Sequence, residues 1–303
     1  MREYLELKSH YDNLSLGVMA VPPVGDTLAV LHVSHGMCGN KERFIPFMEF
    51  MAENGVACVA HDHRGHGSSV MTIDDLGYMY DGGHDALVDD IGLVFRWSKT
   101  RFSGVRSIML GHSMGSLALM SYLRSSPFLP DGAVLCGIPG YSPFAPVAYC
   151  LSTFICRIGL GHMRPRIIRK ITSDRYNHDF ASEGEMAWTC SDPEMRKAFA
   201  EDPLHNFIFT FNGNRALMGL MTDAYAHEDI TMRNDAMPVL MLSGEDDSCA
   251  GGCGGLSKAA CAIHEYGFRN VGIKTYPAMR HEILNEIGKE RVWRDILDFI
   301  KLC

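Results

Sequence analysis

The sequence predicts an α/β fold in which a mostly parallel sheet is flanked by helices. Two observations carry this prediction: short apolar runs recur along the chain, and longer amphipathic stretches lie between them. Continuous apolar runs are typical of strands that are covered on both faces, as in a parallel sheet. Their alternation with helices favours a doubly wound arrangement. The expected strands are Leu14–Ala20, Leu28–Val33, Val56–Ala60, Ser107–Leu110, Ala133–Cys136, Val239–Leu242 and Val271–Tyr276.

The expected helices share an amphipathic pattern, with apolar residues close to the helical period. In His84–Thr100 the residues Leu87, Ile91 and Val94 follow this spacing. Arg43–Asn54 is followed by Gly55, a residue type that commonly ends a helix. The expected helices are Arg43–Asn54, His84–Thr100, Ala259–Tyr266 and Glu290–Leu302.

The strand–helix alternation stops between Ile138 and Thr231. This stretch has few strand-like runs, several aromatic residues and the cationic segment Arg164–Lys170. We therefore expect residues 138–231 to form a mostly helical insertion, and residues 1–137 and 232–303 to form the α/β core.

The composition narrows the class of protein. Of the 303 residues, 47% are hydrophobic and 21% are charged, a globular balance that argues against a disordered or fibrous chain. The net charge of −8 argues against a nucleic-acid partner, because such proteins usually carry a basic surplus. The N-terminal stretch lacks a signal-peptide pattern, and no apolar run reaches the length of a membrane span. With ten scattered cysteines, these features predict a cytoplasmic protein with reduced thiols.

The segment around Ser113 carries the clearest chemical signal. An expected strand runs directly into Gly111-His112-Ser113-Met114-Gly115, and a helical pattern follows. A G-x-S-x-G sequence between a strand and a helix predicts a nucleophile elbow, in which a sharp turn exposes the serine hydroxyl. The flanking glycines would let neighbouring chain approach closely. We therefore expect Ser113 to be a catalytic nucleophile, although a simple Gly-Ser turn is the alternative.

Acyl transfer also requires backbone N–H groups that face the oxygen on which negative charge develops. The first expected donor is Met114, the residue after the nucleophile. The second is Met37, in the turn that follows the strand ending at Val33. We expect His35, Gly36 and His112, which flank these two positions, to contact the substrate.

A serine hydroxyl needs a general base, and the base needs an orienting acid. After an elbow of this kind the acid comes first along the chain and the histidine second. Asp246 and Asp247 both follow the expected strand Val239–Leu242, and the pattern does not separate them. His281 lies in the loop after the next expected strand, and its neutral imidazole could accept the proton of Ser113.

Five segments in this order resemble the monoacylglycerol lipase and lysophospholipase branch of the α/β-hydrolases. They read VSHGMCGNKERF, VACVAHDHRGHGSS, LGHSMGS, LMLSGEDD and MRHEILNE. The resemblance implies an eight-stranded, mostly parallel sheet and a helical cap that matches 138–231. It also implies that Asp247, rather than Asp246, is the acid, because in that family the acid stands three residues after the glycine of the strand-end turn.

Two groups of residues suggest a metal site as an alternative to the serine hydrolase. His61, His63 and His66 form H-D-H-R-G-H, which is close to the ligand set of metallo-β-lactamase-type hydrolases, but Gly65 stands where that set has its aspartate. The cysteines at 249, 253 and 261 have spacings that fit no common zinc pattern. We expect neither metal nor cofactor, and we expect residues 64–67 to form a tight loop near the nucleophile.

The sequence as a whole predicts a serine hydrolase of monoacylglycerol-like esters, with a lysophospholipase or short-chain carboxylesterase as alternatives. A non-catalytic ligand-binding protein of the same fold is the alternative from another class. The cap could touch a membrane surface transiently, since Arg164–Lys170 mixes cations with isoleucines that could face lipid headgroups. A solvated helix face is the other reading of that segment. Aromatic and aliphatic cap residues such as Phe154, Phe207 and Phe209 could line an acyl pocket or simply pack the cap.

Overall fold

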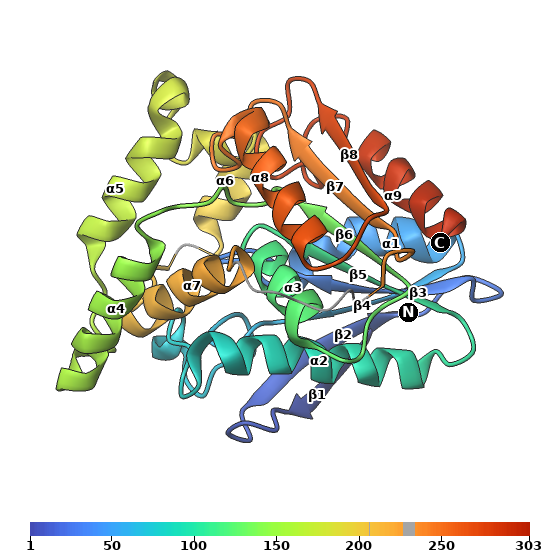
Figure 1. The fold of residues 1–303 in the computed structure, drawn as a ribbon, viewed down its shortest axis with the longest axis horizontal. Helices are drawn as coiled ribbons and strands as arrows, with labels where there is room; N and C mark the ends of the chain where they lie inside the picture. Colours follow the sequence, from blue (N-terminus) through green and yellow to red (C-terminus); the bar gives the residue numbers. More distant parts are fainter. Residues whose placement is uncertain (206, 227–233) are drawn as a thin grey trace.

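The computed structural model describes residues 1–205, 207–226 and 234–303. An eight-stranded sheet with the strand order β1-β2-β4-β3-β5-β6-β7-β8 runs through the molecule (Figure 1). β2 pairs antiparallel with β1 and β4, and all other neighbours are parallel. This is the mostly parallel sheet of the α/β-hydrolase fold that the sequence predicts. The strands are β1 (Glu3–Lys8), β2 (Ser15–Val21), β3 (Ala29–Ser34), β4 (Val56–His61), β5 (Arg106–His112), β6 (Gly132–Cys136), β7 (Val239–Gly244) and β8 (Val271–Tyr276).

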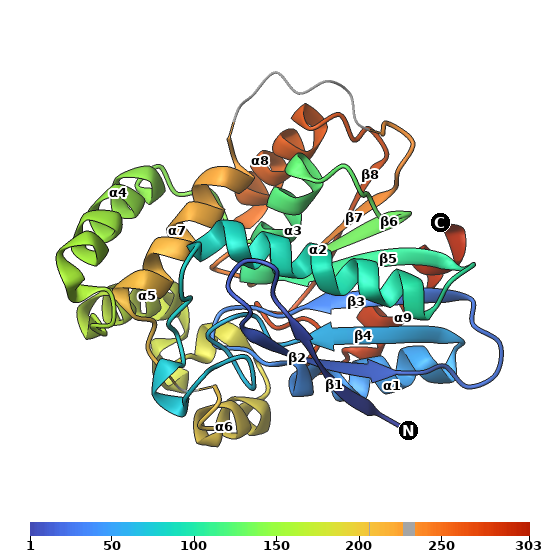
Figure 2. The ribbon, with the colours of Figure 1, turned by 90° about the horizontal axis from the view of Figure 1, so that it is seen from below.

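The helices cover both faces of the sheet, as Figure 2 shows. α1 (Ile45–Glu53) and α9 (Glu290–Leu302) pack on one face through residues such as Met48 and Ile296. α2 (Gly83–Arg101), α3 (Met114–Ser125) and α8 (Gly252–Glu265) pack on the other face. Every residue of β3 and β4 is buried, which explains why their sequences are continuous apolar runs rather than alternating ones.

Two elements differ from the prediction. β1 was not expected, because this edge strand carries only two half-buried leucines, Leu5 and Leu7, between exposed residues. α8 begins seven residues before the expected start at Ala259, within a glycine-rich run of low helix propensity. Gly255 is needed there, because a Cβ at this position would lie 1.7 Å from the backbone oxygen of Ala250.

The segment between β6 and β7 contains α4 (Ala145–Ile155), a π-helical turn (Cys156–Leu160), α5 (Arg166–Asn177), α6 (Pro193–Glu201) and α7 (Phe211–Ala224). No strand is found in its described part, residues 137–205, 207–226 and 234–238. α4 and α5 lie to one side of the sheet in Figure 1, whereas α7 packs against α2 and α3. The expected end of the insertion, at Thr231, lies outside the described residues.

Short 3₁₀ segments connect the larger elements. They are η1 (Lys41–Phe44), η2 (Ile73–Asp75), η4 (His178–Glu183) and η5 (Ala187–Thr189). Among the described helices, none is both long enough and apolar enough to cross a membrane.

Candidate active site

Ser113 lies in a very tight turn between β5 and α3. Its backbone angles are φ 54° and ψ −118°, a conformation that non-glycine residues rarely adopt. A Cβ at Gly111 would lie 2.4 Å from the backbone oxygen of Gly115. A Cβ at Gly115 would lie 2.3 Å from the backbone oxygen of Ser34. Both glycines of the pentapeptide are therefore required by close backbone contacts.

Three of the predicted site residues meet at this turn. His281 Nε2 is 2.8 Å from Ser113 Oγ, and His281 Nδ1 is 2.9 Å from Asp247 Oδ2. The other carboxylate oxygen of Asp247 accepts the backbone N–H groups of Cys249 and Ala250. Asp247 is buried, whereas Asp246 is exposed. Asp247 is thus the aspartate that faces His281, in agreement with the position that the family resemblance implies.

This arrangement selects one tautomer of His281. If Nδ1 donates to the Asp247 carboxylate, Nε2 keeps its lone pair and can accept a hydrogen bond from the Ser113 hydroxyl. Burial disfavours the charged imidazolium. The charge of Asp247 and its hydrogen bond outweigh burial, so the pKa of His281 is raised above its usual value.

The turn after β3 lies directly against the serine. A Cβ at Gly36 would lie 2.9 Å from Ser113 Cβ, so only a glycine permits this approach. Gly36 O accepts the N–H of Gly39 at 3.0 Å and lies 2.8 Å from His35 Nδ1. This carbonyl belongs to the same planar peptide unit as the Met37 N–H, so both contacts orient that N–H. Met114 is the first residue of α3, where N–H groups have no partner within the helix.

His35 and His112 are buried, and each has at least one ring nitrogen next to the backbone. His35 Nε2 accepts the N–H of His63 at 2.9 Å, so both ring nitrogens of His35 face backbone groups. His112 Nε2 is 3.2 Å from the backbone oxygen of His281. The structure therefore places both rings beside the site as supports for its backbone. The predicted substrate contacts of His35, Gly36 and His112 remain predictions.

A sequence profile of the family described as serine aminopeptidase, S33, matches residues 25–288. The chain belongs to this family of hydrolases. A monoacylglycerol lipase from Mycolicibacterium smegmatis is 24% identical over 287 residues, which cover 92% of this chain and 90% of that protein.

Solved structures of other hydrolases share the fold. A thermostable carboxyl esterase from Bacillus coagulans, in complex with glycerol, matches with a TM-score of 0.88 and 21% identity, covering 99% of this chain and 97% of that one. A soluble variant of monoglyceride lipase from Saccharomyces cerevisiae, in complex with a substrate analog, matches with a TM-score of 0.77 and 17% identity, covering 98% and 94%.

In this family member, the segment between β6 and β7 also reaches the site. The ring of Trp188 contacts that of His281 in a tilted arrangement, with their centroids 5.1 Å apart and an angle of 44° between the ring planes. Arg280 pairs with Glu183 through two contacts of 2.6 and 3.0 Å and donates to the backbone oxygen of Ala187. The N–H of Glu282 donates to the backbone oxygen of Thr189. The residues on both sides of His281 therefore hold the chain that carries Trp188.

Sequence reasoning missed these contacts. Arg280 stands next to a predicted site residue, but nothing in the local pattern indicates its partner about a hundred residues away. Glu282 is a second omission. It is buried and pairs with Arg43 at 2.9 Å, and although burial opposes its ionisation, Arg43 and nearby histidines hold its pKa well below the usual value.

The histidines of the H-D-H-R-G-H segment serve the protein's own hydrogen bonds. His66 Nδ1 contacts the backbone oxygen of Arg64, His63 Nε2 contacts that of His35, and His61 Nδ1 contacts His32. Among the described residues, no three potential ligands gather as a metal site requires. Of the three cysteines in the zinc-site hypothesis, Cys249 is buried and Cys261 is exposed. The Cys253 side chain lies outside the described part.

The tight loop predicted at 64–67 is present and is anchored by charge. Arg64 is fully buried and pairs with Asp90 at 2.8 Å and with Asp12 at 2.9 Å. Asp62 accepts Lys41 Nζ at 2.6 Å and the Ser68 N–H at 2.7 Å. These ion pairs join the loop to Asp12 between β1 and β2, to Asp90 of α2 and to Lys41 of η1.

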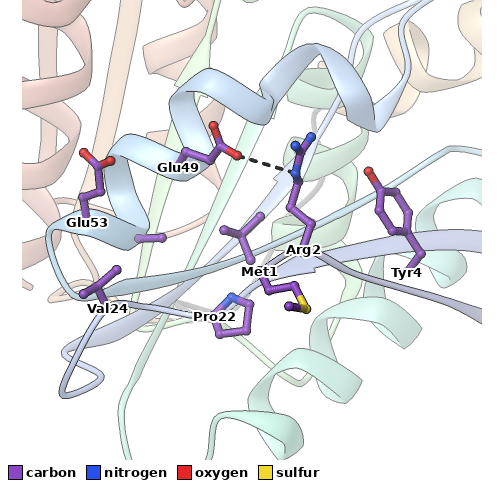
Figure 3. Close-up of a pocket in the computed structure, with 9 residues that line it drawn as sticks. Met1, Arg2, Tyr4, Pro22, Val24, Glu49 and Glu53 are labelled. Carbon is purple, nitrogen blue, oxygen red and sulfur yellow. Dashed lines mark ion pairs between the residues drawn. The ribbon is translucent and has the colours of Figure 1, made fainter.

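One hollow on the surface lies away from this site. It has a volume of about 650 Å³ and is lined by the first residues of the chain, the end of β2 with the loop after it, and α1, and there Arg2 pairs with Glu49 at 3.5 Å (Figure 3). None of the predicted site residues lines it. Its exposed, charged rim gives no reason to place the substrate there.

Proposed function

We propose that this protein is a serine hydrolase that cleaves carboxylic esters of monoacylglycerol-like lipids through an acyl-enzyme. One observation carries the proposal: the Ser113 hydroxyl, the His281 imidazole and the Asp247 carboxylate form a continuous hydrogen-bonded chain at a strained strand–helix turn. In such a chain the base can take the hydroxyl proton while the carboxylate stabilises the imidazolium.

In the proposed reaction, Ser113 Oγ attacks the ester carbonyl carbon while His281 Nε2 takes its proton. The carbonyl oxygen becomes an oxyanion that the N–H groups of Met37 and Met114 stabilise. Collapse of the tetrahedral intermediate breaks the bond to the alcohol, which receives the proton from His281. Water then attacks the acyl-enzyme with His281 as base, and the acid is released with Ser113 regenerated. The residues supply every proton transfer, so the proposal needs no cofactor.

The substrate class rests on the relatives and on the molecule's own surface. The Mycolicibacterium smegmatis relative is named a monoacylglycerol lipase, and the coverage extends over nearly the whole chain. A lysophospholipase or a short-chain carboxylesterase would use the same three residues. A non-catalytic binding protein is less favoured, because binding alone does not require a histidine aligned between a serine and an aspartate.

We further propose that residues 138–231 form a cap that touches lipid surfaces transiently. α4 and the turn after it expose five large apolar residues at intervals of three or four residues, and α5 exposes Ile167 and Ile171. The five residues are Phe144, Val147, Leu151, Phe154 and Ile158. Such a stripe on one helix is typical of an interfacial helix.

Arg164 does not contact lipid headgroups in this proposal, since it donates to the backbone oxygens of Leu76 and Ile208.

A cytoplasmic location is part of the same proposal. The nine cysteines whose side chains are described carry free thiols, and a reducing compartment keeps thiols in this form.

The deciding experiment is hydrolysis of p-nitrophenyl esters with acyl lengths from C2 to C16. We expect Ser113→Ala to lower kcat by about 10³-fold or more, because the nucleophile is removed while the fold is kept. Ser125→Ala, an exposed serine at the end of α3, is the matched control and should retain full activity. The preferred acyl length separates a lipase from an esterase.

Two results would contradict the proposal. Turnover by Ser113→Ala equal to that of the wild type would exclude Ser113 as the nucleophile. Absence of both turnover and fluorophosphonate labelling in the wild type would favour the binding-protein alternative.

A further inference from the structure

Cys38 holds an unfavourable backbone conformation in the turn that carries the proposed oxyanion donor. Gly36 O accepts the N–H of Gly39, so residues 36–39 form a turn in which Met37 and Cys38 are the central pair. Cys38 has φ 54°, in the left-handed region that is unfavourable for a non-glycine residue. A strained residue of this kind persists only where its surroundings hold it.

Three hydrogen bonds hold Cys38, and they come from two different parts of the chain. Its N–H donates to His66 Nε2 at 3.2 Å, from the loop after β4. Its backbone oxygen accepts from His205 Nδ1, and its thiol lies 3.4 Å from the backbone oxygen of Phe207. His205 and Phe207 both belong to the segment between β6 and β7.

Both histidine rings can make these hydrogen bonds to Cys38 in their neutral form. His66 Nδ1 is 3.1 Å from the backbone oxygen of Arg64, so it carries the proton and leaves Nε2 as the acceptor for Cys38. Burial lowers the pKa of His66 to about 4 and that of His205 to about 4, which keeps both rings neutral near pH 7. His66 also contacts the rings of Phe207 and Phe209, so the two holding groups pack on one another.

Relaxation of Cys38 would change the position of Met37. A return of Cys38 to negative φ requires the peptide between residues 37 and 38 to rotate, which breaks the hydrogen bond from the Cys38 N–H to His66 and changes the backbone angles of Met37. The Gly36–Met37 peptide, which carries the Met37 N–H, is then no longer fixed in its present orientation. An error of about 1 Å in a catalytic group can lower the rate by about 100-fold.

We propose that His66 and His205 are positioning residues that hold Cys38, and through it the Met37 N–H, in the geometry of the oxyanion hole. Because His205 and Phe207 belong to the segment between β6 and β7, the oxyanion hole is complete only while that segment is packed on the core. This inference rests on the proposed function and adds a link between the cap and the chemical step.

The test compares four variants that separate ring packing from hydrogen bonding. His66→Phe and His205→Phe keep an aromatic ring against Phe207 and Phe199 but remove the polar contact to Cys38. His66→Gln restores an acceptor near Nε2, and His205→Asn restores a donor near Nδ1. His178→Phe, an exposed histidine in the same segment, is the matched control.

The measured quantities are kcat and KM on a p-nitrophenyl ester, and the inhibition constant of a trifluoromethyl ketone with the same acyl chain. This ketone forms a tetrahedral adduct with serine whose oxyanion occupies the proposed hole. We expect both Phe variants to lower kcat about 10- to 100-fold, somewhat less than the loss of one whole oxyanion donor. The inhibition constant should rise by the same factor while KM changes little, and the Gln and Asn variants should recover most of kcat.

Several results would overturn the inference. One is a folded His205→Phe with unchanged kcat and inhibition constant; another is a loss of kcat that His205→Asn and His66→Gln do not recover. Should the fully buried His66→Phe fail to fold, His205→Phe and the Gln variant decide. A wild type without turnover overturns the proposed function and this inference with it, whereas active wild type beside fully active Phe variants overturns only the inference.

Discussion

At the scale of single residues, the surroundings of His281 set its protonation. Burial and the nearby charge of Arg43 lower the pKa of His281, whereas the carboxylates of Asp247 and Glu282 raise it. The carboxylates outweigh the other two effects, so the pKa of His281 is raised. The proposed base must be neutral to accept a proton. A raised pKa therefore moves the loss of activity in acid to a higher pH than an ordinary histidine would give.

The first prediction concerns this acid limb. We expect kcat/KM of the wild type to fall with a midpoint above pH 6.5, the usual histidine value. Asp247→Asn removes the largest raising contribution and leaves burial, so the midpoint should move to lower pH. The same change should reduce kcat by about 10⁴-fold, because the amide favours the wrong tautomer. The measurement is a pH–rate profile of both proteins, and a midpoint that rises or stays in Asp247→Asn would contradict this account.

At the scale of elements, the site is built where strands of the parallel sheet end. β5 delivers Ser113, the turn after β7 delivers Asp247 and the loop after β8 delivers His281. The carboxyl ends of parallel strands share one edge of the sheet, which brings these distant positions together. The segment between β6 and β7 contacts this edge through Trp188, which lies against His281, and through His205, which lies against Cys38.

The second prediction concerns the exposed face of α4. We expect the wild type to cosediment with vesicles of phosphatidylcholine and phosphatidylglycerol. Leu151→Glu and Phe154→Glu should each weaken this partitioning about tenfold, as the loss of one buried apolar side chain would. Val24→Glu, at an equally exposed apolar residue in the loop between β2 and β3, is the control.

The charged face of α5 gives a related expectation. Arg166→Glu and Lys170→Glu should weaken binding to the anionic vesicles and leave binding to pure phosphatidylcholine unchanged. If the α4 variants bind both vesicle types as well as the wild type, the cap surface does not contact lipid.

At the scale of the whole molecule, five buried histidines link the fold to pH. His32, His35, His61, His63 and His66 lie in a continuous group beneath the site. Burial lowers the pKa of each, that of His32 to about 3. Unfolding exposes these rings to water, where they bind protons near pH 6.5.

The third prediction is therefore a steep loss of stability in mild acid. Between pH 6.5 and about 4 the unfolded chain binds protons that the folded chain does not, so the free energy of unfolding decreases as the pH falls. Each fully neutral histidine contributes a slope of about 1.4 kcal/mol per pH unit. The raised pKa of His281 acts in the opposite direction, whereas the lowered pKa values of His84, His112 and His205 act in the same direction as those of the group.

Urea unfolding at pH 7.5 and pH 5.5 measures this slope. His32→Phe should reduce it by about one histidine's contribution, whereas the exposed His178→Gln should leave it unchanged. Equal unfolding midpoints at the two pH values would contradict the role given to the buried group.

The buried strands, the flanking helices and the strand–Ser113–helix turn can be predicted from the sequence alone. These features depend on local patterns, namely apolar runs, helical spacing and glycines beside a serine. The order of the motifs also indicates His281 as the base and either Asp246 or Asp247 as the acid. Of these two aspartates, the family resemblance implies Asp247.

The contacts between individual groups follow from the folded arrangement and not from the sequence pattern. The folded arrangement separated the buried Asp247 from the exposed Asp246, and it brought Trp188 to His281 and His205 to Cys38. It also paired the edge strand β1 with β2, although β1 has little apolar pattern of its own. The contacts of Trp188 and His205 join residues that are far apart in the chain, and their formation depends on how the segment between β6 and β7 packs on the sheet. No local pattern of residues encodes that docking, because it is determined by the packing of surfaces that exist only after the core has folded.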